Sequence, residues 1–487
     1  MMVEVVLWQI NLLYNYIIMK HNISEFQHKI VKVIAQNIEV DYKEPYKLQD
    51  ATSGIGTGFF IKGNYIITCS HVVDNSKVVL IEIPVEGKKK YKVELVGICP
   101  KFDIAVLKSV EYKSKSYFKM GDSDKIRSGN EVLAIGFPLG QNSIKITKGI
   151  VSGRQYGNIQ TDTPINPGNS GGPLVYNGLV IGINKSIILK SNNVGYSVPI
   201  NKYKTIKTEL FQKNKSPNYV RRINTSNLFL YNNTNESMLK INNAKHGIYI
   251  RNVNDKFIIQ IKKQKSNLMI GDILTHFADH KIDNYGYIKN KKINEKVLFN
   301  ELLDYIKVGS DIPIEFIRNN KKYKASFKYE YLQLPIRKIY TQYEVHDYEV
   351  VGGIVMTDLT MNYINLLYKE EELEYSLAQY MDKINRLKPL VVISYIFPNT
   401  NVETLDVLET QDIIKSVNNI TVNTISELRK AVRKYITVAK KKFIIIETLK
   451  NKQVVINFDD YMNIANNMRN TFKYPRTELY NKMIKNI

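Results

Sequence analysis

Several residue types that define whole classes of protein are scarce in this sequence. Its 487 residues include two cysteines and one tryptophan. The two cysteines, Cys69 and Cys99, cannot build a disulfide framework, and their spacing matches no metal-binding pattern. We therefore expect reduced, buried thiols, with a single bridge between them as the alternative, and we expect neither a metal nor another cofactor.

Acidic residues are also few relative to basic ones. The chain has 46 Asp and Glu against 69 Lys and Arg, a formal net charge of +23. A basic excess favours nucleic-acid binding when its residues cluster, because clustered cations neutralise phosphates. Here they are scattered through a chain rich in Lys, Asn, Ile and Tyr, so nucleic-acid binding is the weakest functional hypothesis. The length suggests about three domains.

No long hydrophobic run is free of polar residues. The most apolar segment, residues 3–19, has no basic stretch before it and is too short to span a bilayer. Four polar residues interrupt it: Glu4, Gln9, Asn11 and Asn15. We expect residues 1–28 to form an extension that packs on the first domain, with a weak membrane anchor as the alternative. Without a recognisable signal peptide, the sequence predicts a cytoplasmic location.

Short β-rich runs fill the chain from residue 31 to about residue 200. Examples are GFFIKGNYIITC, KVVLIEIPV and EVLAIGF, each broken by Gly, Asn, Asp or Pro. Many short strands at this spacing are typical of an all-β barrel or sandwich and not of βαβ units. A helix-like stretch follows Pro199, and a polar segment at 214–225 then has the composition of a linker.

One serine, Ser170, stands among glycines in the segment GNSGGP. A serine hydroxyl becomes nucleophilic when a neighbouring base takes its proton. The negative charge that forms on an attacked carbonyl needs preorganised donors, commonly backbone N–H groups. Glycine permits the sharp turn that would point the amides of Gly168 and Ser170 into one pocket. Taken alone, the segment is equally compatible with an ordinary tight turn.

Two further residues supply the partners that a catalytic serine requires. His71 is the one histidine of the β-rich region, and it directly follows an apolar strand. Asp103 enters another apolar strand, where a buried carboxylate needs a partner such as an imidazole N–H. The chain order His71, Asp103, Ser170 is that of the chymotrypsin-type triad. The three residues together predict nucleophilic catalysis.

Five segments closely resemble the HtrA/Deg serine proteases, over residues 30 to about 200. They read GIGTGFFIKGNYIITCSHVVD, KFDIAVLK, MGDSDKIRSGNEVLAIGFPLG, ITKGIVSGRQ and TDTPINPGNSGGPLVYNGLVIGIN. The resemblance implies a mainly β chain, with a chymotrypsin-like double β-barrel at 29–213 followed by PDZ domains. It also implies an ATP-independent serine endopeptidase that cleaves unfolded or misfolded proteins. By this resemblance His71 is the general base, Asp103 orients it, Ser170 attacks, and Gly168, Asn169 and Ser170 form the oxyanion hole.

The same resemblance suggests a specificity pocket lined by Ile165, Ile188 and Tyr196. None of these side chains is acidic, so we expect a small or medium apolar residue at P1 and not Lys or Arg. Residues 184–189 would be the edge strand that pairs with substrate. Cys69 departs from the family pattern, in which polar residues are common here, and we expect the thiol to make the enzyme sensitive to oxidation.

The second half of the chain contains a repeat. GDILTHFADHKIDN at 271–284 matches QDIIKSVNNITVNT at 411–424, and a helix-like stretch and a strand follow each copy. Two copies of one module are implied, and the module resembles a PDZ domain. We place PDZ-like domain 1 at 226–332, a degenerate PDZ-like domain 2 at 333–462 and a tail at 463–487. This arrangement resembles the plant-type Deg proteases.

The first PDZ-like module lacks one expected feature. Its carboxylate-binding loop would be SNLFL at 226–230, which has no glycine. Capture of a free C-terminus is therefore not expected, and assembly, gating or binding of internal substrate segments are the alternatives. A basic, aromatic insertion at 284–294 is either a solvated loop or a contact with another subunit, since the family forms trimers or multiples of trimers. The competing function is a catalytically silent chaperone or PDZ scaffold.

Overall fold

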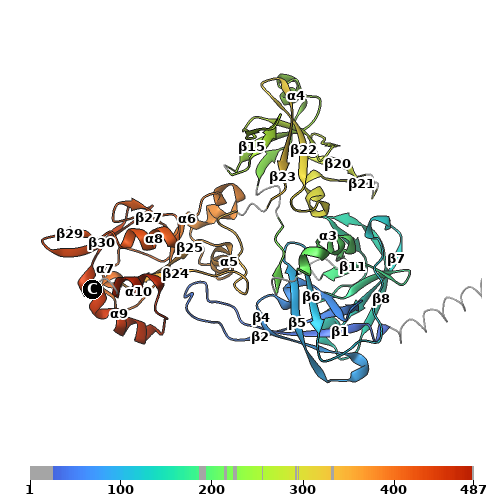
Figure 1. The fold of residues 1–487 in the computed structure, drawn as a ribbon, viewed down its shortest axis with the longest axis horizontal. Helices are drawn as coiled ribbons and strands as arrows, with labels where there is room; N and C mark the ends of the chain where they lie inside the picture. Colours follow the sequence, from blue (N-terminus) through green and yellow to red (C-terminus); the bar gives the residue numbers. More distant parts are fainter. Residues whose placement is uncertain are drawn as a thin grey trace, which may run out of the picture. The chain divides into compact units, whose positions relative to one another are not determined.

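The computed structural model of this chain describes residues 26–185, 194–212, 217–222, 228–254, 256–290, 293, 295–330 and 334–484. The chain divides into two compact units (Figure 1). One unit contains Met1–Asn37 and Thr52–Leu332, and the other contains Ile38–Ala51 and Gln333–Ile487. The expected N-terminal extension lies outside the described residues up to residue 25. No helix of the described residues is long and apolar enough to cross a membrane.

The first unit begins with a sheet that closes on itself. Its order is β13-β5-β4-β1-β2-β3-β6, and β5 also pairs with β6. The strands are β1 (Ile30–Asn37), β2 (Thr52–Ile61), β3 (Tyr65–Thr68), β4 (Ser76–Glu82), β5 (Lys90–Cys99), β6 (Ile104–Ser109) and β13 (Asn218–Tyr219). Their inward aliphatic side chains are fully buried, for example Val33, Ile66 and Val106. This is the first of the two barrels that the sequence predicts.

A second closed barrel follows, in the order β10-β11-β12-β9-β8-β7. Its strands are β7 (Glu131–Gly136), β8 (Lys145–Gln155), β9 (Asn158–Thr161), β10 (Pro173–Tyr176), β11 (Leu179–Lys185) and β12 (Gly195–Pro199). A compact apolar core fills it, including Val132, Ile159 and Leu174. The double β-barrel fold is therefore confirmed.

The helix predicted after Pro199 is also confirmed, as α3 (Ile200–Leu210). Its buried residues recur every three or four positions, so one face packs against the barrels. Gly97 of β5 permits this approach, because a Cβ there would lie 2.5 Å from the Leu210 carbonyl oxygen. Beyond α3, β13 pairs in parallel with β5, so the middle of the predicted linker is bound to the first barrel.

The remainder of the first unit is one sheet with the order β14-β15-β18-β22-β23-β16-β17, to which β19 is added beside β18. The strands are β14 (Phe229–Asn232), β15 (Ile248–Val253), β16 (Ile259–Ile261), β17 (Gln264–Ser266), β18 (Ile273–Phe277), β19 (His280–Lys281), β22 (Asp311–Arg318) and β23 (Lys321–Lys328). α4 (Glu236–Ile241) and a hairpin of β20 (Tyr287–Asn290) and β21 (Glu295–Leu298) complete it. The helix-like stretch at 299–306 is a 3-10 helix, η5 (Phe299–Tyr305), and not an α-helix.

The second unit has two sheets, β24-β25-β26 and β28-β27-β30-β29, with β31 paired to β30. The strands are β24 (Tyr348–Val351), β25 (Ile354–Asp358), β26 (Val391–Ile396), β27 (Ile414–Val417), β28 (Ile420–Thr421), β29 (Ile436–Val438), β30 (Lys441–Thr448) and β31 (Gln453–Asn457). The helices are α5 (Met361–Lys369), α6 (Tyr375–Ala378), α7 (Asn401–Leu405), α8 (Ile425–Val432), α9 (Phe458–Phe472) and α10 (Glu478–Ile484). Within the segment predicted as a tail, Leu479 and Met483 of α10 are buried in the core of this unit.

The segment between the first two strands of the first barrel belongs to the second unit. Residues 38–51 connect β1 to β2 in the chain, and they pack with residues 333–487. Tyr46 lies within 5.9 Å of the ring centroids of Phe397 and Tyr474, and the Tyr42 hydroxyl accepts a 2.7 Å hydrogen bond from Asn362. Sequence position alone had placed this segment in the protease domain.

The repeat seen in the sequence has a structural counterpart at equivalent aspartates. Asp272 accepts a hydrogen bond from the Met269 N–H at 2.8 Å, and Asp412 accepts one from the Glu409 N–H at 3.0 Å. Each aspartate follows a residue in the left-handed conformation, Gly271 (φ 99°) and Gln411 (φ 75°) respectively. Both carboxylates are buried, and basic side chains pair with them. The same turn is therefore built twice.

Candidate active site

The local fold fixes the backbone that carries His71. Strand β3 ends at Thr68, and the one-turn helix α2 (Ser70–Val73) follows. Val72 anchors α2 against Gly56 of β2, where a Cβ would lie only 2.6 Å from the valine methyl groups. The His71 side chain remains 46% exposed. The helix is thus packed firmly, while the imidazole stays accessible from solvent.

Asp103 lies in the turn between β5 and β6 and has a positive φ of 57°. Its carboxylate accepts hydrogen bonds from His71 Nδ1 at 2.8 and 2.9 Å, from the His71 backbone N–H at 3.0 Å and from Ser70 Oγ at 3.0 Å. Burial alone would raise the pKa of this carboxyl. The bonds from His71 and the positive charges of His71 and Lys185 outweigh burial and hold the pKa well below its usual range.

The ionised Asp103 determines which nitrogen of the imidazole carries hydrogen. A carboxylate can only accept, so Nδ1 of His71 is the donor in this contact. In the neutral ring, Nε2 then has a free lone pair and can accept a proton. His71 can therefore act as a base through Nε2, the ring nitrogen on the side opposite Asp103.

Ser170 is held in a buried loop between β9 and β10. Thr57 of β2 binds this loop twice, through its N–H to the Ser170 carbonyl at 2.8 Å and its Oγ1 to the Gly168 carbonyl at 2.6 Å. From the other side, the Gly171 N–H donates to the Asn184 carbonyl at 2.8 Å. The serine is thus fixed between a strand of the first barrel and β11 of the second.

The loop of Ser170 meets the segment of His71 directly. A Cβ at Gly171 would lie 2.9 Å from the Cys69 backbone nitrogen, so no side chain fits there. Cys69 also donates its thiol to the Asn184 carbonyl, at 3.3 Å, which is the acceptor of the Gly171 N–H. The structure therefore brings together the stretches that contain all three predicted catalytic residues.

The predicted oxyanion loop has a conformation that requires glycine. Gly168 has a φ of 97°, and a Cβ there would lie 2.2 Å from the Phe137 carbonyl oxygen. The Asn169 N–H donates to the Asn166 carbonyl at 3.0 Å, so this amide is engaged within the loop. The assignment of the Gly168 and Ser170 amides as the oxyanion donors stays a prediction.

Two of the three residues predicted for the specificity pocket can be described. A Cβ at Gly195 would lie 2.9 Å from Ile165 Cδ1, so Ile165 packs beside the residue that precedes Tyr196. Tyr196 is 7% exposed and donates its hydroxyl to Gln155 Oε1 at 3.2 Å. Ile188 lies outside the described residues. The joint role of Ile165, Ile188 and Tyr196 in one pocket stays a prediction.

Both cysteines are free and buried, which confirms the prediction of reduced thiols. Burial first, and the charge of Asp103 second, raise the pKa of the Cys69 thiol well above its ordinary value. A protonated, buried thiol reacts slowly with oxidants, so the structure argues against the expected oxidation sensitivity. The Cys69 sulfur, a ring nitrogen of His71 and a carboxylate oxygen of Asp103 all lie within 4.8 Å of one another, and Asp103 is hydrogen-bonded to the imidazole.

One residue at this site was missed by sequence reasoning. Lys185 Nζ lies 3.3 Å from Asp103 Oδ2, and the lysine side chain is 33% exposed. The only local signal was a basic residue at the end of the apolar strand LVIGINK. Nothing in that pattern specifies a contact with an aspartate in a distant turn.

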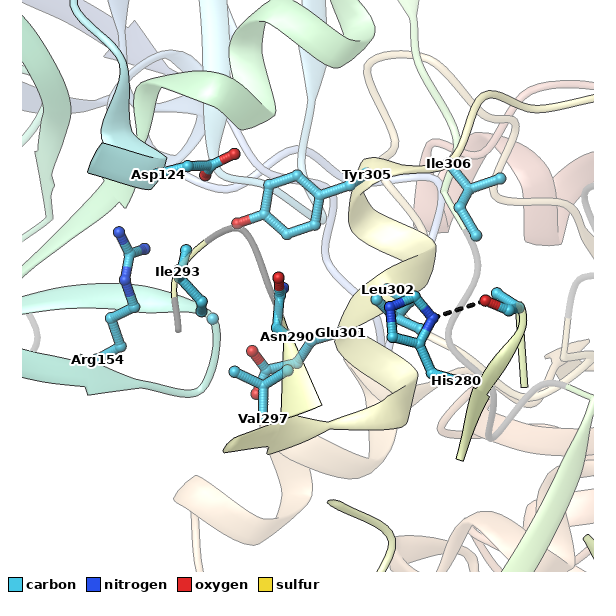
Figure 2. A pocket seen from close by; sticks show the side chains of 12 residues that line it. Asp124, Arg154, His280, Asn290, Ile293, Val297, Glu301, Leu302, Tyr305 and Ile306 are labelled. Atoms are coloured by element: carbon cyan, nitrogen blue, oxygen red, sulfur yellow. Dashed lines mark hydrogen bonds between the residues drawn. The ribbon is translucent and has the colours of Figure 1, made fainter. Parts of the chain in front are cut away.

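A separate cavity of about 360 Å³ lies elsewhere in the first unit (Figure 2). Its lining residues are Asp124, Arg154, Gly157, Ala278, His280, Asn290, Ile293, Val297, Glu301, Leu302, Tyr305 and Ile306. Figure 2 shows the Tyr305 hydroxyl directed toward the side of the cavity where Asp124 and Arg154 lie. Asn290 and Ile293 belong to the insertion predicted at 284–294, so part of that insertion forms a cavity wall.

The predicted carboxylate-binding loop is described only from Leu228 onward. Leu228 and Phe229 are 3% and 2% exposed, and both belong to the core of this part of the unit. Their side chains therefore serve packing. Residues 226 and 227 lie outside the described residues, and the loss of C-terminal capture stays a prediction.

Comparison with known proteins finds relatives of the first part of the chain. A family model for the trypsin-like peptidase domain matches residues 56–183. A probable periplasmic serine endoprotease DegP-like from Marinomonas sp. (strain MWYL1) is 42% identical over 164 residues, which cover 31% of this chain and 34% of that protein. The serine protease Do-like HtrA of Bacillus subtilis (strain 168) is 29% identical over 304 residues, covering 58% and 64% respectively. The chain thus spans about a third of the DegP-like relative.

Solved structures resemble this chain less closely than these sequence relatives do. The HtrA-type protease AlgW with tripeptide is 22% identical, with a TM-score of 0.47, over 62% of this chain and 93% of that chain. The serine endoprotease from Yersinia pestis has a TM-score of 0.44 at 20% identity, over 63% and 95%. The resemblance to the HtrA/Deg proteases is confirmed by the sequence relatives, and the closer likeness to plant-type Deg proteases stays a prediction.

The predicted cytoplasmic location is wrong by the same comparison. The relative from Marinomonas and the DegP of Escherichia coli (strain K12) are both named periplasmic serine endoproteases. The prediction had relied on the polar interruptions of residues 3–19, which lie outside the described residues. Those interruptions argued against one kind of targeting segment and did not specify a compartment.

Proposed function

We propose that this chain is a serine endopeptidase of the HtrA/Deg type that cleaves unfolded or misfolded proteins without ATP. Residues 56–183 match the trypsin-like peptidase domain, and the sequence relatives are DegP-like and HtrA serine proteases. The observation that carries the proposal is the His71–Asp103 pair, which lies beside the glycine-rich loop of Ser170. A mainly structural barrel would not need a buried, ionised aspartate bonded to an exposed imidazole.

The proposed reaction gives each of these residues a defined role. His71 Nε2 takes the proton of Ser170 Oγ as the oxygen attacks the peptide carbonyl, and Asp103 stabilises the imidazolium that forms. The backbone N–H groups of Gly168 and Ser170 stabilise the oxyanion. The imidazolium then protonates the leaving amine. Water, activated by the same base, cleaves the acyl-enzyme and restores the free serine.

We further propose that Ile165, Ile188 and Tyr196 select an apolar P1 residue. A Lys or Arg side chain in this pocket would lack a counter-ion, which is costly in a desolvated site. The PDZ-like domains would serve assembly, gating or the binding of internal substrate segments. Formation of a trimer, or of a multiple of trimers, belongs to the same proposal.

The competing proposal is a catalytically silent chaperone or PDZ scaffold. Hydrolysis of casein by the wild-type full chain and by Ser170→Ala separates the two, with circular dichroism to show that both are folded. If the chain is a serine protease, the wild type should cleave casein and Ser170→Ala should not. Absence of cleavage by a folded wild type, or equal cleavage by the variant, would overturn the proposal. Size-exclusion chromatography with light scattering of the same samples tests the trimer.

A further inference from the structure

A lysine shares the carboxylate that orients the catalytic base. Lys185 Nζ approaches Asp103 Oδ2 to 3.3 Å, while His71 Nδ1 lies 2.8 Å from the same oxygen. Lys185 is the last residue of β11 and lies opposite Tyr196 of β12. The chymotrypsin-type triad uses Ser, His and Asp alone. Here a fourth, positively charged group contacts the Asp.

The other groups around this carboxylate cannot offset its negative charge as a lysine does. Cys69 approaches it from the position just before α2, and Ser70 and His71 approach it from α2 itself. The Cys69 thiol and the Ser70 hydroxyl are uncharged. Among the described residues that contact Asp103, Lys185 is therefore the only side chain with a permanent positive charge.

We propose that Lys185 is a positioning residue of the catalytic pair, whose ammonium partly offsets the charge of Asp103 at His71 and so extends activity to a lower pH than the pair alone would allow. The inference rests on the proposed protease function. A carboxylate beside an imidazole favours the protonated ring. An ammonium on the same carboxylate offsets part of that field and repels the imidazolium directly. The enzyme thereby retains a competent base in mildly acidic conditions.

The size of the effect follows from distance and exposure. The interaction between two unit charges weakens with their separation and with the effective dielectric near a protein surface. One third of the Lys185 side chain is exposed, so solvent reduces this further. We expect removal of the ammonium to raise the pH of half-maximal activity by about half to one pH unit.

The test is the rate of fluorophosphonate inactivation of the full chain between about pH 5 and 9, a range that spans histidine titration. Lys185→Met removes the charge and keeps an unbranched chain, Lys185→Arg keeps the charge, and Lys148→Met removes an exposed lysine that pairs with Glu131. We expect Lys185→Met to shift the midpoint upward, and the other two variants to retain the wild-type midpoint. High salt should reduce the shift, since the pair is partly exposed.

Melting curves establish that each variant is folded, and Lys185→Arg provides a charged reference if Lys185→Met is less stable. An unchanged midpoint in folded Lys185→Met, or an equal shift in Lys148→Met, would overturn the role of Lys185 and leave the protease proposal intact. A folded wild type in which Ser170 is never labelled would overturn both. A midpoint that returns to the wild-type value in Lys185→Arg would support the role of charge over a merely structural role.

Discussion

Oδ2 of Asp103 lies 2.8 Å from Nδ1 of His71, and the aspartate reaches this position from a turn in which its φ is 57°. Asp103 thus has a left-handed backbone between two apolar residues, Phe102 and Ile104. Phe102 and Ile104 on either side are buried, so the turn cannot move easily. The orientation of the catalytic base is therefore built into the packing of the first barrel.

Asp103→Asn is expected to abolish most activity without unfolding the protein. An amide in this position can donate to Nδ1, which favours the wrong tautomer of His71 and removes the lone pair at Nε2. By analogy with other triads, the loss of kcat should be about 10³- to 10⁴-fold. Initial rates of casein cleavage measure it. Asp311→Asn, an exposed substitution at the start of β22, serves as the matched control. Near-normal rates in Asp103→Asn would contradict the role of Asp103.

Gly168→Ala is expected to damage both the fold and the oxyanion loop. The new Cβ would lie 2.2 Å from the Phe137 carbonyl oxygen, in addition to the strain of a positive φ. Gly178→Ala is the matched control, because Gly178 has a φ of 75° and open space around it. The control should lose about 1–2 kcal/mol from the backbone alone. A larger loss in Gly168→Ala, measured by thermal unfolding, is the predicted result, and equal losses would contradict the steric argument.

The specificity pocket predicts which peptide bonds are cut. Peptides with Val, Ala or Leu at P1 should be cleaved faster than peptides with Lys or Arg. Tyr196→Ala should widen the pocket and shift the preference toward Phe or Met. Mass spectrometry of the fragments from one unfolded protein, digested by wild type and variant, maps both preferences. Cleavage mainly after Lys or Arg would refute the apolar pocket.

The second unit should lose stability in acid through His346. Burial lowers the pKa of this imidazole to about 4, and its Nε2 is buried without a hydrogen-bond partner among the described residues. The unfolded chain takes up this proton below about pH 6.5. The folded chain takes it up only near pH 4, so stability falls as the pH drops from 6.5 toward 4.

His346→Phe removes this proton and preserves the ring contact with Tyr42, whose centroid lies 5.3 Å away. Between pH 7.5 and 5, the wild type should lose about 2 kcal/mol more stability than the variant. Thermal unfolding at both pH values gives the comparison. If wild type and variant lose the same stability, His346 does not control the acid sensitivity.

The triad could be predicted because each member lies in a local pattern. Ser170 stands in a glycine-rich turn, His71 follows an apolar strand, and Asp103 interrupts one. The repeat was also visible, because Asp272 and Asp412 occupy equivalent turns with the same hydrogen bonds. Local sequence carries these features since turn chemistry depends on a few consecutive residues.

Other features depend on contacts between segments far apart in the chain. Lys185 meets Asp103 only after both barrels have formed, and residues 38–51 join a unit whose other residues begin at 333. No hydrophobic period or turn signal specifies such contacts. The 3-10 form of η5 was missed for a similar reason, because Phe299, Leu303 and Asp304 are buried by their tertiary surroundings.

The most direct test of the catalytic account identifies the residue that a fluorophosphonate modifies. The folded full chain is treated with the probe at about pH 8, where an unperturbed imidazole is neutral, and then digested for peptide mass spectrometry. We expect one phosphonylated residue, Ser170, and no modification in the His71→Ala variant, which lacks the base. Casein cleavage by the wild type without modification of Ser170, or modification of a different serine, would contradict the account.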